Sequence, residues 1–220
     1  MYILAFDTTA AACSIVLRQD DKVLSRFCQV MDFGQAEVLI PQIKNMLEQH
    51  NLNFADIDLL LVCVGPGSFT GVRASIAAAR TFPLACPNLA LDGVSAFEAY
   101  ALGLDENERA DLNAVIIETK RADFYVQVFD RNLNKLTPPQ ALAYADILPL
   151  LRNKKVSLIG DGVERFLSQP SGLSLHCIKM PEMLDIDWLI EAGLRHYHDK
   201  RLDYPKPLYL RAPDVTAPKR

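Results

Sequence analysis

The stretch best suited to chemistry is residues 59–80, where a glycine turn joins a strand to a helix. Residues 59–64 are all apolar, which predicts a buried strand because the run is too short to cross a membrane. The sequence Gly-Pro-Gly at 65–67 permits a tight reversal of the backbone. Ser68 then stands where it can cap a helix that begins at Phe69. A strand, a glycine turn and a helix N-terminus in this order predict a place where backbone N–H groups face an anion.

Gly65, Gly67 and Ser68 are therefore candidate cofactor-binding residues. The turn is not a P-loop, because no Gly-Lys-Ser/Thr follows it. It also misses the dinucleotide fingerprint, since Thr70 stands where the third glycine should be. A glycine turn that only joins a strand to its helix explains the same residues equally well.

The helix after the turn has a surface made mostly of small side chains, namely Ala74, Ser75, Ala77, Ala78 and Ala79. A smooth helix lets another backbone approach closely, and two interpretations are equally open. The helix either packs tightly on its own sheet or is presented to another subunit. Pro83 and Pro87 are expected to mark its end.

Composition excludes several classes of protein. The net charge of −4 argues against a chain that grips nucleic acid by itself, although it leaves docking through a basic partner open. The five cysteines include no C-x-x-C pair, which favours reduced thiols in a cytosolic protein. The N-terminus lacks the basic start of a signal peptide, and no apolar stretch reaches membrane-spanning length. We therefore expect a cytoplasmic protein with no membrane contact.

The first half of the chain predicts the element order β-β-β-α-β-α-β-α. Strands are expected at residues 2–8, 13–18, 22–29, 59–64 and 88–91, and helices at 35–50, from residue 69 and at 95–104. The first strand ends at Asp7, a carboxylate expected to cap the neighbouring turn. Ser95 and Glu98 have the spacing of a capping box. This order resembles the lobe repeated in the actin, hexokinase and Hsp70 superfamily, an α/β fold with a mixed five-stranded sheet and flanking helices.

A polar run at residues 105–111 then predicts a boundary, with a first lobe at 1–106 and a second, reduced lobe at 107–220. Strands at 114–117, 123–129, 156–159 and 174–178 are expected in the second lobe, followed by an amphipathic helix at 185–200 and an extended tail. His196 and His198 point about 200° apart on that helix, so we expect both on the surface.

Four motifs together resemble the TsaB family, also called YeaZ: ILAFDTT at 3–9, VGPGSFTGVR at 64–73, GVSAFEA at 93–99 and YLR at 209–211. The resemblance implies an actin-like, ribonuclease H-like fold of two lobes and a protein without transferase activity of its own. It implies pairing with TsaD, the paralogue that transfers a threonylcarbamoyl group to an adenosine beside the anticodon of tRNAs reading codons that begin with adenine. The ATPase TsaE joins that assembly, and tRNA is reached through the complex.

The resemblance also implies which residues pair. The family pairs through helices of the first lobe, with TsaD or, in isolation, as a homodimer. The corresponding residues here are Arg73, Ala74, Ala77, Ala78, Leu39 and Ile43.

Several family motifs for chemistry are missing. The TsaD metal motif His-x-x-x-His corresponds to Ala96 and Tyr100, and the second-lobe turn at 118–122 has no glycine. We therefore expect no catalytic residue, no metal and no cofactor bound by this chain alone, with ATP and threonylcarbamoyl-adenylate used by the complex. The alternatives are an actin-like ATPase or kinase and a metallopeptidase, and the missing motifs disfavour both.

Overall fold

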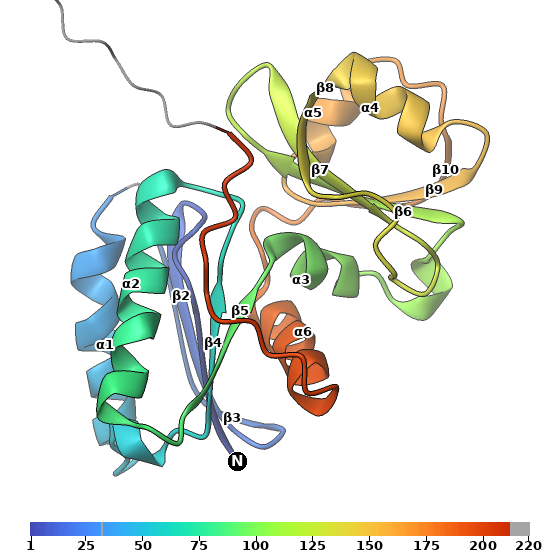
Figure 1. Ribbon diagram of the computed structural model, residues 1–220. Coiled ribbons are helices and arrows are strands. Elements are labelled where there is room, and N and C mark those ends of the chain that lie inside the picture. Colours follow the sequence, from blue (N-terminus) through green and yellow to red (C-terminus); the bar gives the residue numbers. More distant parts are fainter. Residues whose placement is uncertain (32, 212–220) are drawn as a thin grey trace, which may run out of the picture.

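Three antiparallel strands open the chain in the computed structural model, which describes residues 1–31 and 33–211 (Figure 1). They are β1 (Tyr2–Asp7), β2 (Ala12–Gln19) and β3 (Lys22–Val30). The strands β4 (Leu59–Cys63) and β5 (Ala90–Val94) add to β1 in parallel, so the first sheet has the order β3-β2-β1-β4-β5. The predicted meander, the buried strand before the glycine turn and the mixed five-stranded sheet are thus confirmed.

The helices α1 (Gln35–Gln49) and α2 (Phe69–Ala85) lie side by side over one face of this sheet (Figure 1). Strand residues alternate between the two faces, so Leu4, Leu60 and Val62 pack under these two helices while Ile3 and Leu61 face the opposite side. Pro83 does not end α2, which continues to Ala85 and is capped by the N–H of Cys86 donating to the Phe82 carbonyl.

The second lobe repeats the first. Its sheet has the order β8-β7-β6-β9-β10, which matches the first sheet strand for strand. The strands are β6 (Leu112–Glu118), β7 (Asp123–Phe129), β8 (Gln140–Ala143), β9 (Lys155–Ile159) and β10 (Ser174–Lys179). The helices α4 (Tyr144–Leu151) and α5 (Val163–Leu167) correspond to α1 and α2 but are much shorter. The sequence did not predict β8, α4 or α5, because each is short and lacks a clear period.

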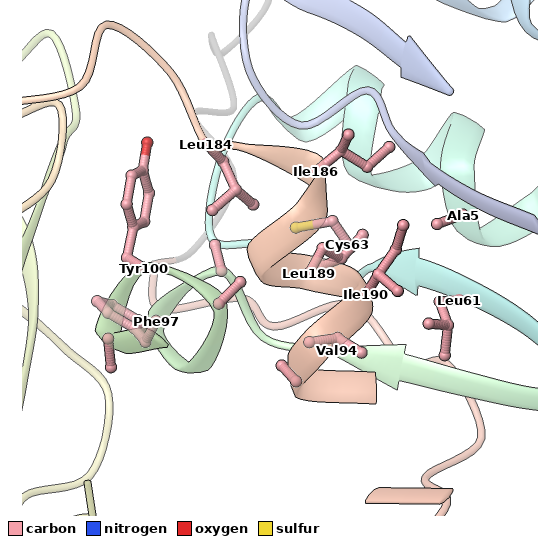
Figure 2. Close-up of a cluster of buried hydrophobic side chains, with 14 of the residues drawn as sticks. Ala5, Leu61, Cys63, Val94, Phe97, Tyr100, Leu184, Ile186, Leu189 and Ile190 are labelled. Carbon is pink, nitrogen blue, oxygen red and sulfur yellow. The ribbon is translucent and has the colours of Figure 1, made fainter. Parts of the chain in front are cut away.

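The third helix of each lobe packs across the junction between the lobes. The helix α3 (Ala96–Leu102) contacts β6 and β7 of the second sheet, whereas α6 (Ile186–His198) packs on β1, β4 and β5 of the first (Figure 2). Leu189 and Ile190 of α6 are fully buried with Phe97 of α3 between them and the second lobe. The predicted second lobe at 107–220 includes this C-terminal helix, whose apolar face packs on the first sheet.

Short 3₁₀ turns at Phe54–Asp56 and Glu106–Glu108 and an extended C-terminal segment complete the fold. The C-terminal segment crosses the first lobe, where the Gly93 N–H donates to the Asp203 carbonyl at 2.8 Å and the Leu208 N–H to the Val64 carbonyl at 2.9 Å. The predicted extended tail is confirmed to residue 211, and residues 212–220 lie outside the described part. In the described part, no helix has both the length and the apolar character needed to span a bilayer.

Candidate functional site

The glycine turn after β4 packs against the end of the first strand of the same lobe. Gly65 adopts a φ of +97°, which favours glycine, and its carbonyl accepts the Ala96 N–H at 2.9 Å. Ser68 caps α2 by accepting the Gly71 N–H at 3.3 Å, as predicted. The Ser68 N–H donates to the Thr9 carbonyl at 2.7 Å, and a Cβ at Gly67 would overlap that same carbonyl oxygen.

The helix α2 begins against Thr8 in the same way. The Thr8 hydroxyl donates to the Gly71 carbonyl at 2.8 Å and lies 2.5 Å from the Ser75 hydroxyl, and all three residues are buried. A Cβ at Gly71 would overlap the Thr8 carbonyl oxygen. Gly67 and Gly71 are thus required by the packing of the turn against Thr9 and Thr8, and Gly65 by its φ, whether or not a ligand binds there. Cofactor binding by Gly65, Gly67 and Ser68 stays a prediction.

Asp7 is buried and serves the turn as predicted. Its carboxylate accepts the Thr9 N–H at 2.7 Å. Burial raises the pKa of Asp7, although the hydrogen bonds from Thr9 oppose that rise. The carboxylate therefore orders the β1 turn on which the glycine motif packs.

The small residues of α2 divide between two roles. Ser75 and Ala79 are fully buried against the sheet, which is the packing interpretation. Arg73 and Ala77 are exposed, and Ala74 and Ala78 are half-buried. The inner face of the helix therefore packs on its own sheet, and the outer face is open to another subunit. The outer face carries the residues that the resemblance assigned to pairing.

Four apolar side chains on or beside α1 and α2 face solvent, namely Phe33, Ile40, Phe69 and Leu84. Leu84 near the end of α2 is 86% exposed, and Phe33 just before α1 is 89% exposed. Ile40 on α1 is also exposed. Sequence reasoning missed these residues, although Leu84 lies one residue after the proline that was expected to end the helix. We call the exposed residues Phe33, Ile40, Phe69, Arg73, Ala77 and Leu84, on or beside α1 and α2, the α2 face.

Leu39 and Ile43 do not belong to the α2 face. Leu39 is 1% exposed and Ile43 is 0% exposed, because both point from α1 into the core of the first lobe. They have the period of an apolar helix face, and in this chain that face packs on its own sheet. Their assignment to the pairing surface is therefore wrong.

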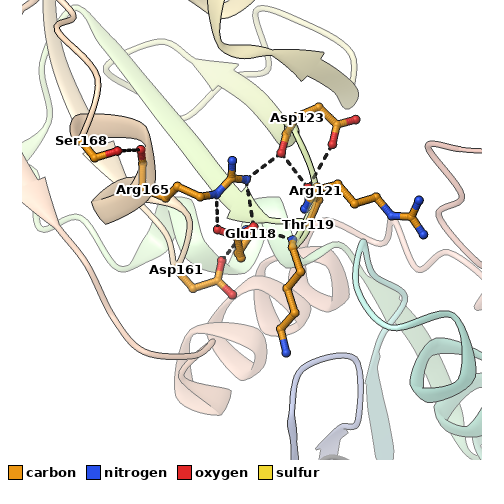
Figure 3. Close-up of polar contacts among 8 residues, drawn as sticks. Glu118, Thr119, Arg121, Asp123, Asp161, Arg165 and Ser168 are labelled. Atoms are coloured by element: carbon orange, nitrogen blue, oxygen red, sulfur yellow. Dashed lines mark hydrogen bonds and ion pairs between the residues drawn. The ribbon is translucent and has the colours of Figure 1, made fainter.

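In the second lobe, the turn after β6 is held by charged side chains (Figure 3). The Arg165 guanidinium donates to the Glu118 carboxylate at 2.7 and 2.9 Å and to the Asp123 carbonyl at 2.7 Å. The Asp161 carboxylate accepts the Glu118 N–H at 2.9 Å. Arg211, in the C-terminal segment, forms an ion pair with Asp123. This network lies at the turn after β6, which corresponds to the turn after β1 in the first lobe, whereas the counterpart of the glycine turn is the turn after β9, at residues 160–162.

The environment shifts the two acids of this network in opposite directions. Burial raises the pKa of Glu118, but hydrogen bonds from Arg165 and from backbone N–H groups outweigh it, so the net pKa is lowered. Burial dominates at Asp161 and raises its pKa to about 6. Glu118 is therefore the charged partner of Arg165, and Asp161 is the more easily protonated acid of the pair.

His196 lies in a buried cluster that sequence reasoning missed. Its Nδ1 lies 2.8 Å from the Asp92 carboxylate and its Nε2 lies 3.3 Å from Glu98, which also accepts from Lys135 at 2.8 Å. The prediction that His196 is a surface residue is wrong. The predicted capping box is also wrong, because Glu98 reaches across the lobe junction and Ser95 alone caps α3. The signal was available, since His196 is seven residues after the buried Leu189 and shares its face of α6.

This cluster holds the lobes together and has no free group for proton transfer. Hydrogen bonds to Asp92 and then Glu98 raise the pKa of His196 to about 9, against the effect of burial. Burial raises the pKa of Glu98, but His196 and Lys135 outweigh it and lower that pKa to about 2. An imidazolium whose two nitrogens both face carboxylates is a structural cation, because neither nitrogen is open to a substrate.

No group of three His, Cys, Asp or Glu side chains within residues 1–31 and 33–211 is arranged to hold a metal ion. Ala96 and Tyr100, which stand at the positions of the TsaD metal ligands, are both buried in α3. Tyr100 packs at 6.2 Å from Trp188 of α6, measured between ring centroids. The corresponding part of α3 is thus used for packing between the lobes.

Comparison with known proteins points to one group. The tRNA N6-adenosine threonylcarbamoyltransferase family, TsaD, matches residues 34–209. The tRNA threonylcarbamoyladenosine biosynthesis protein TsaB of Bacillus subtilis is 26% identical over 199 residues, covering 89% of this chain and 82% of that protein. TsaB of Escherichia coli is 31% identical over 134 residues, covering 61% of this chain and 57% of that protein.

Solved structures agree on the fold. YeaZ from Pseudomonas aeruginosa superposes with a TM-score of 0.77 at 18% identity, covering 95% of this chain and 99% of that one. A ROK hexokinase from Thermus thermophilus superposes with a TM-score of 0.50 at 11% identity, covering 91% and 100%. The expected actin-like fold of two lobes is confirmed.

Proposed function

The chain belongs to the TsaB family of tRNA threonylcarbamoyladenosine biosynthesis proteins, also called YeaZ, and we propose that it is the non-catalytic partner of a TsaD transferase. In this role it is required for forming N6-threonylcarbamoyladenosine next to the anticodon of tRNAs that read codons beginning with adenine. The complex, with TsaE, uses ATP and threonylcarbamoyl-adenylate, and this chain supplies no reacting group.

The observation that carries the proposal is the α2 face. Arg73 and Ala77 are exposed on a helix with few bulky side chains, and Leu84 and Phe33 add apolar area with almost no cover. Exposed apolar side chains beside a smooth helix are typical of a surface that pairs with another protein. The Arg73 guanidinium lies 5.1 Å from the centre of the Phe69 ring, which holds the cation on this face.

Both turns at the lobe junction support a role without bound nucleotide. The first is packed on Thr8 and Thr9 by close backbone contact, and the second is occupied by the ion pair of Glu118 with Arg165. Kinases of this fold leave glycine-lined space at these turns so that phosphates can approach the backbone. We infer that this chain acts by docking, which raises the population of the competent state of TsaD without adding catalytic groups.

A reconstitution tests the proposal. TsaD and TsaE are incubated with tRNA, ATP and threonylcarbamoyl-adenylate, with and without this chain, and the nucleosides are measured by mass spectrometry. Modified adenosine that forms only with the chain present supports an obligatory partner. Full modification without the chain overturns the proposal.

The oligomeric state provides a second check. We propose that isolated chains pair with one another through the α2 face and that TsaD displaces the second copy. Sedimentation of the chain alone and with an equimolar amount of TsaD distinguishes a homodimer from a heterodimer. A monomer in both samples contradicts the pairing.

A further inference from the structure

A groove of about 670 Å³ lies on the second lobe between two connecting loops. One loop joins α4 to β9 and the other joins α5 to β10, so the groove sits at the amino ends of both strands. It is lined by Asp111, Leu151, Arg152, Asn153, Lys154, Lys155 and residues 171–174.

The groove is strongly cationic. Arg152, Lys154 and Lys155 are all exposed, and none of them forms an ion pair with any part of residues 1–31 and 33–211. The one carboxylate in the lining is Asp111, which accepts the Lys155 backbone N–H at 3.3 Å. Three positive charges thus face one negative charge, in a chain whose net charge is −4. Such a reversal of local sign marks a surface that attracts anions.

The corresponding position of the first lobe is closed. There the loops before β4 and β5 are covered by Phe54 and Phe82, whose ring centroids lie 4.9 Å apart, together with Leu52 and Leu89. Phe82 belongs to the last turn of α2, which has 17 residues. Its counterpart α5 has 5 residues, and its one ring, Phe166, packs on Phe124 and Tyr144 within the second lobe. Among the described residues, no aromatic side chain lines the groove.

The groove is far from the α2 face. Figure 1 shows α1 and α2 on one side of the molecule and the connections of α4, α5, β9 and β10 on the other. It also lies at the opposite end of β9 from residues 160–162. A partner that covers the α2 face therefore leaves the groove open to a further component of the complex.

We propose that this groove binds the phosphate backbone of RNA, and that in the complex it contacts the substrate tRNA. This proposal rests on the proposed function. The lining favours phosphate over a protein segment, because it offers cations and the hydroxyls of Ser171 and Ser174 but no aromatic anchor. The contact is auxiliary, since the acidic net charge of the chain disfavours tight binding of RNA by this protein alone.

The test compares two variants that change the net charge equally. Lys154→Glu/Lys155→Glu reverses the groove, and the control Lys22→Glu/Lys200→Glu reverses two exposed lysines elsewhere. Each is assembled with TsaD, and binding of an unmodified tRNA transcript that reads a codon beginning with adenine is titrated over a range of salt. The groove variant should bind about tenfold more weakly at low salt, with a salt dependence shallower by about 1–2 released ions, because each phosphate contact contributes about 0.9. The control should change affinity by less than about twofold.

Three outcomes overturn the proposal. Equal weakening by both variants means that only overall charge matters, and unchanged tRNA affinity means that the groove does not touch RNA. Loss of co-elution with TsaD in the groove variant means that the groove is a protein interface. Failure of the proposed function is separate, because the reconstitution with the unaltered chain detects it whatever these variants do.

Discussion

The two lobes share one topology but present different surfaces. Both sheets follow the same strand order, and each is crossed by three helices in the same sequence. The first lobe keeps long α1 and α2, of 15 and 17 residues, whose outer face is smooth and partly apolar. The second has α4 and α5 of 8 and 5 residues and a cationic groove where the first is closed. Helix length therefore decides which surface each lobe offers to partners.

The turns at the lobe junction share a close backbone contact at glycines and differ in the side chains added to it. In the first lobe, backbone meets backbone, and Gly67 and Gly71 are needed because no Cβ fits beside Thr9 and Thr8. In the second lobe, Gly160 and Gly162 likewise leave no room for a Cβ beside Ile116, and Arg165 adds an ion pair with Glu118. The second lobe therefore holds its turn by a backbone contact and an ion pair together.

The largest effect is expected on pairing. Ala77→Glu places a charge in the centre of the α2 face, and desolvating it on docking should weaken binding to TsaD more than about 100-fold. The matched control is Ala145→Glu, an exposed alanine on α4 of the second lobe. Affinity is measured by titration calorimetry with TsaD. If both substitutions have the same effect, the two lobes do not differ in their role and the α2 face is wrongly placed.

The next effect tests the backbone contact of the first lobe. Gly71→Ala forces a Cβ against the Thr8 carbonyl and should lower the free energy of unfolding by about 3 kcal/mol. Gly172→Ala is the control, because no atom lies within 4 Å of its would-be Cβ and only its φ of +60° is strained. That strain should cost about 1 kcal/mol. Urea unfolding measures both, and equal losses would mean that Thr8 can move aside.

The His196 cluster, which joins the lobes, should make stability depend on pH. Its folded-state pKa of about 9 is above the ordinary 6.5, so its contribution is complete below about pH 6.5 and is lost as the pH rises through about 9. We expect a loss of about 2 kcal/mol between pH 6 and pH 9.5, measured by urea unfolding. His196→Gln should remove most of that loss. A variant that keeps the full pH dependence would place its origin elsewhere.

The same cluster should also make the stability of the protein fall at acid pH. Because the folded-state pKa of Glu98 is lowered to about 2, its contribution is complete above about pH 4.5 and is lost as the pH falls toward 2. Glu98→Gln should therefore flatten the stability curve on the acid side while its alkaline side changes less. If Glu98→Gln lost stability on the acid side as steeply as the unaltered chain does, Glu98 would not bind the lobes together.

The smallest effect tests the ion pair of the second lobe. Glu118→Gln keeps the shape of the side chain but removes the charge that faces Arg165, and it should cost about 1 kcal/mol because the pair is partly exposed. Arg26→Gln is a control at a more exposed ion pair, with Asp187, and should cost less than about 0.5 kcal/mol. Chemical denaturation distinguishes the two. A loss at Glu118 as large as that at Gly71 would mean that the ion pair contributes as much as the backbone contact.

Patterns with a regular period were readable from the sequence. The three opening strands, the strand at residues 59–64 and the helix after Ser68 all agree with the structure, because alternation and helical spacing reflect one buried face. Leu39 and Ile43 show the limit of that reasoning. Their spacing located a buried face but did not say which surface covers it, and the cover proved to be their own sheet.

Short elements were not readable. The strand β8 and the helix α5 have 4 and 5 residues, too few for a period to emerge. His196 was misjudged because its environment comes from β5, α3 and a second-lobe hairpin, through Asp92, Glu98 and Lys135. Contacts between residues about 100 positions apart leave no local signal.

The sequence by itself determined the family motifs, the first lobe and the glycine turn, because these depend on local spacing and on which residue types are present. Only the tertiary structure decided that α6 completes the first lobe, that Ser75 and Ala79 face inward while Ala77 faces outward, and that the second lobe opens into a cationic groove. Each of these depends on which distant surface meets a given face. That choice is made by the packing of the whole chain, where burial of apolar area and pairing of buried charge act between segments that are not neighbours in sequence.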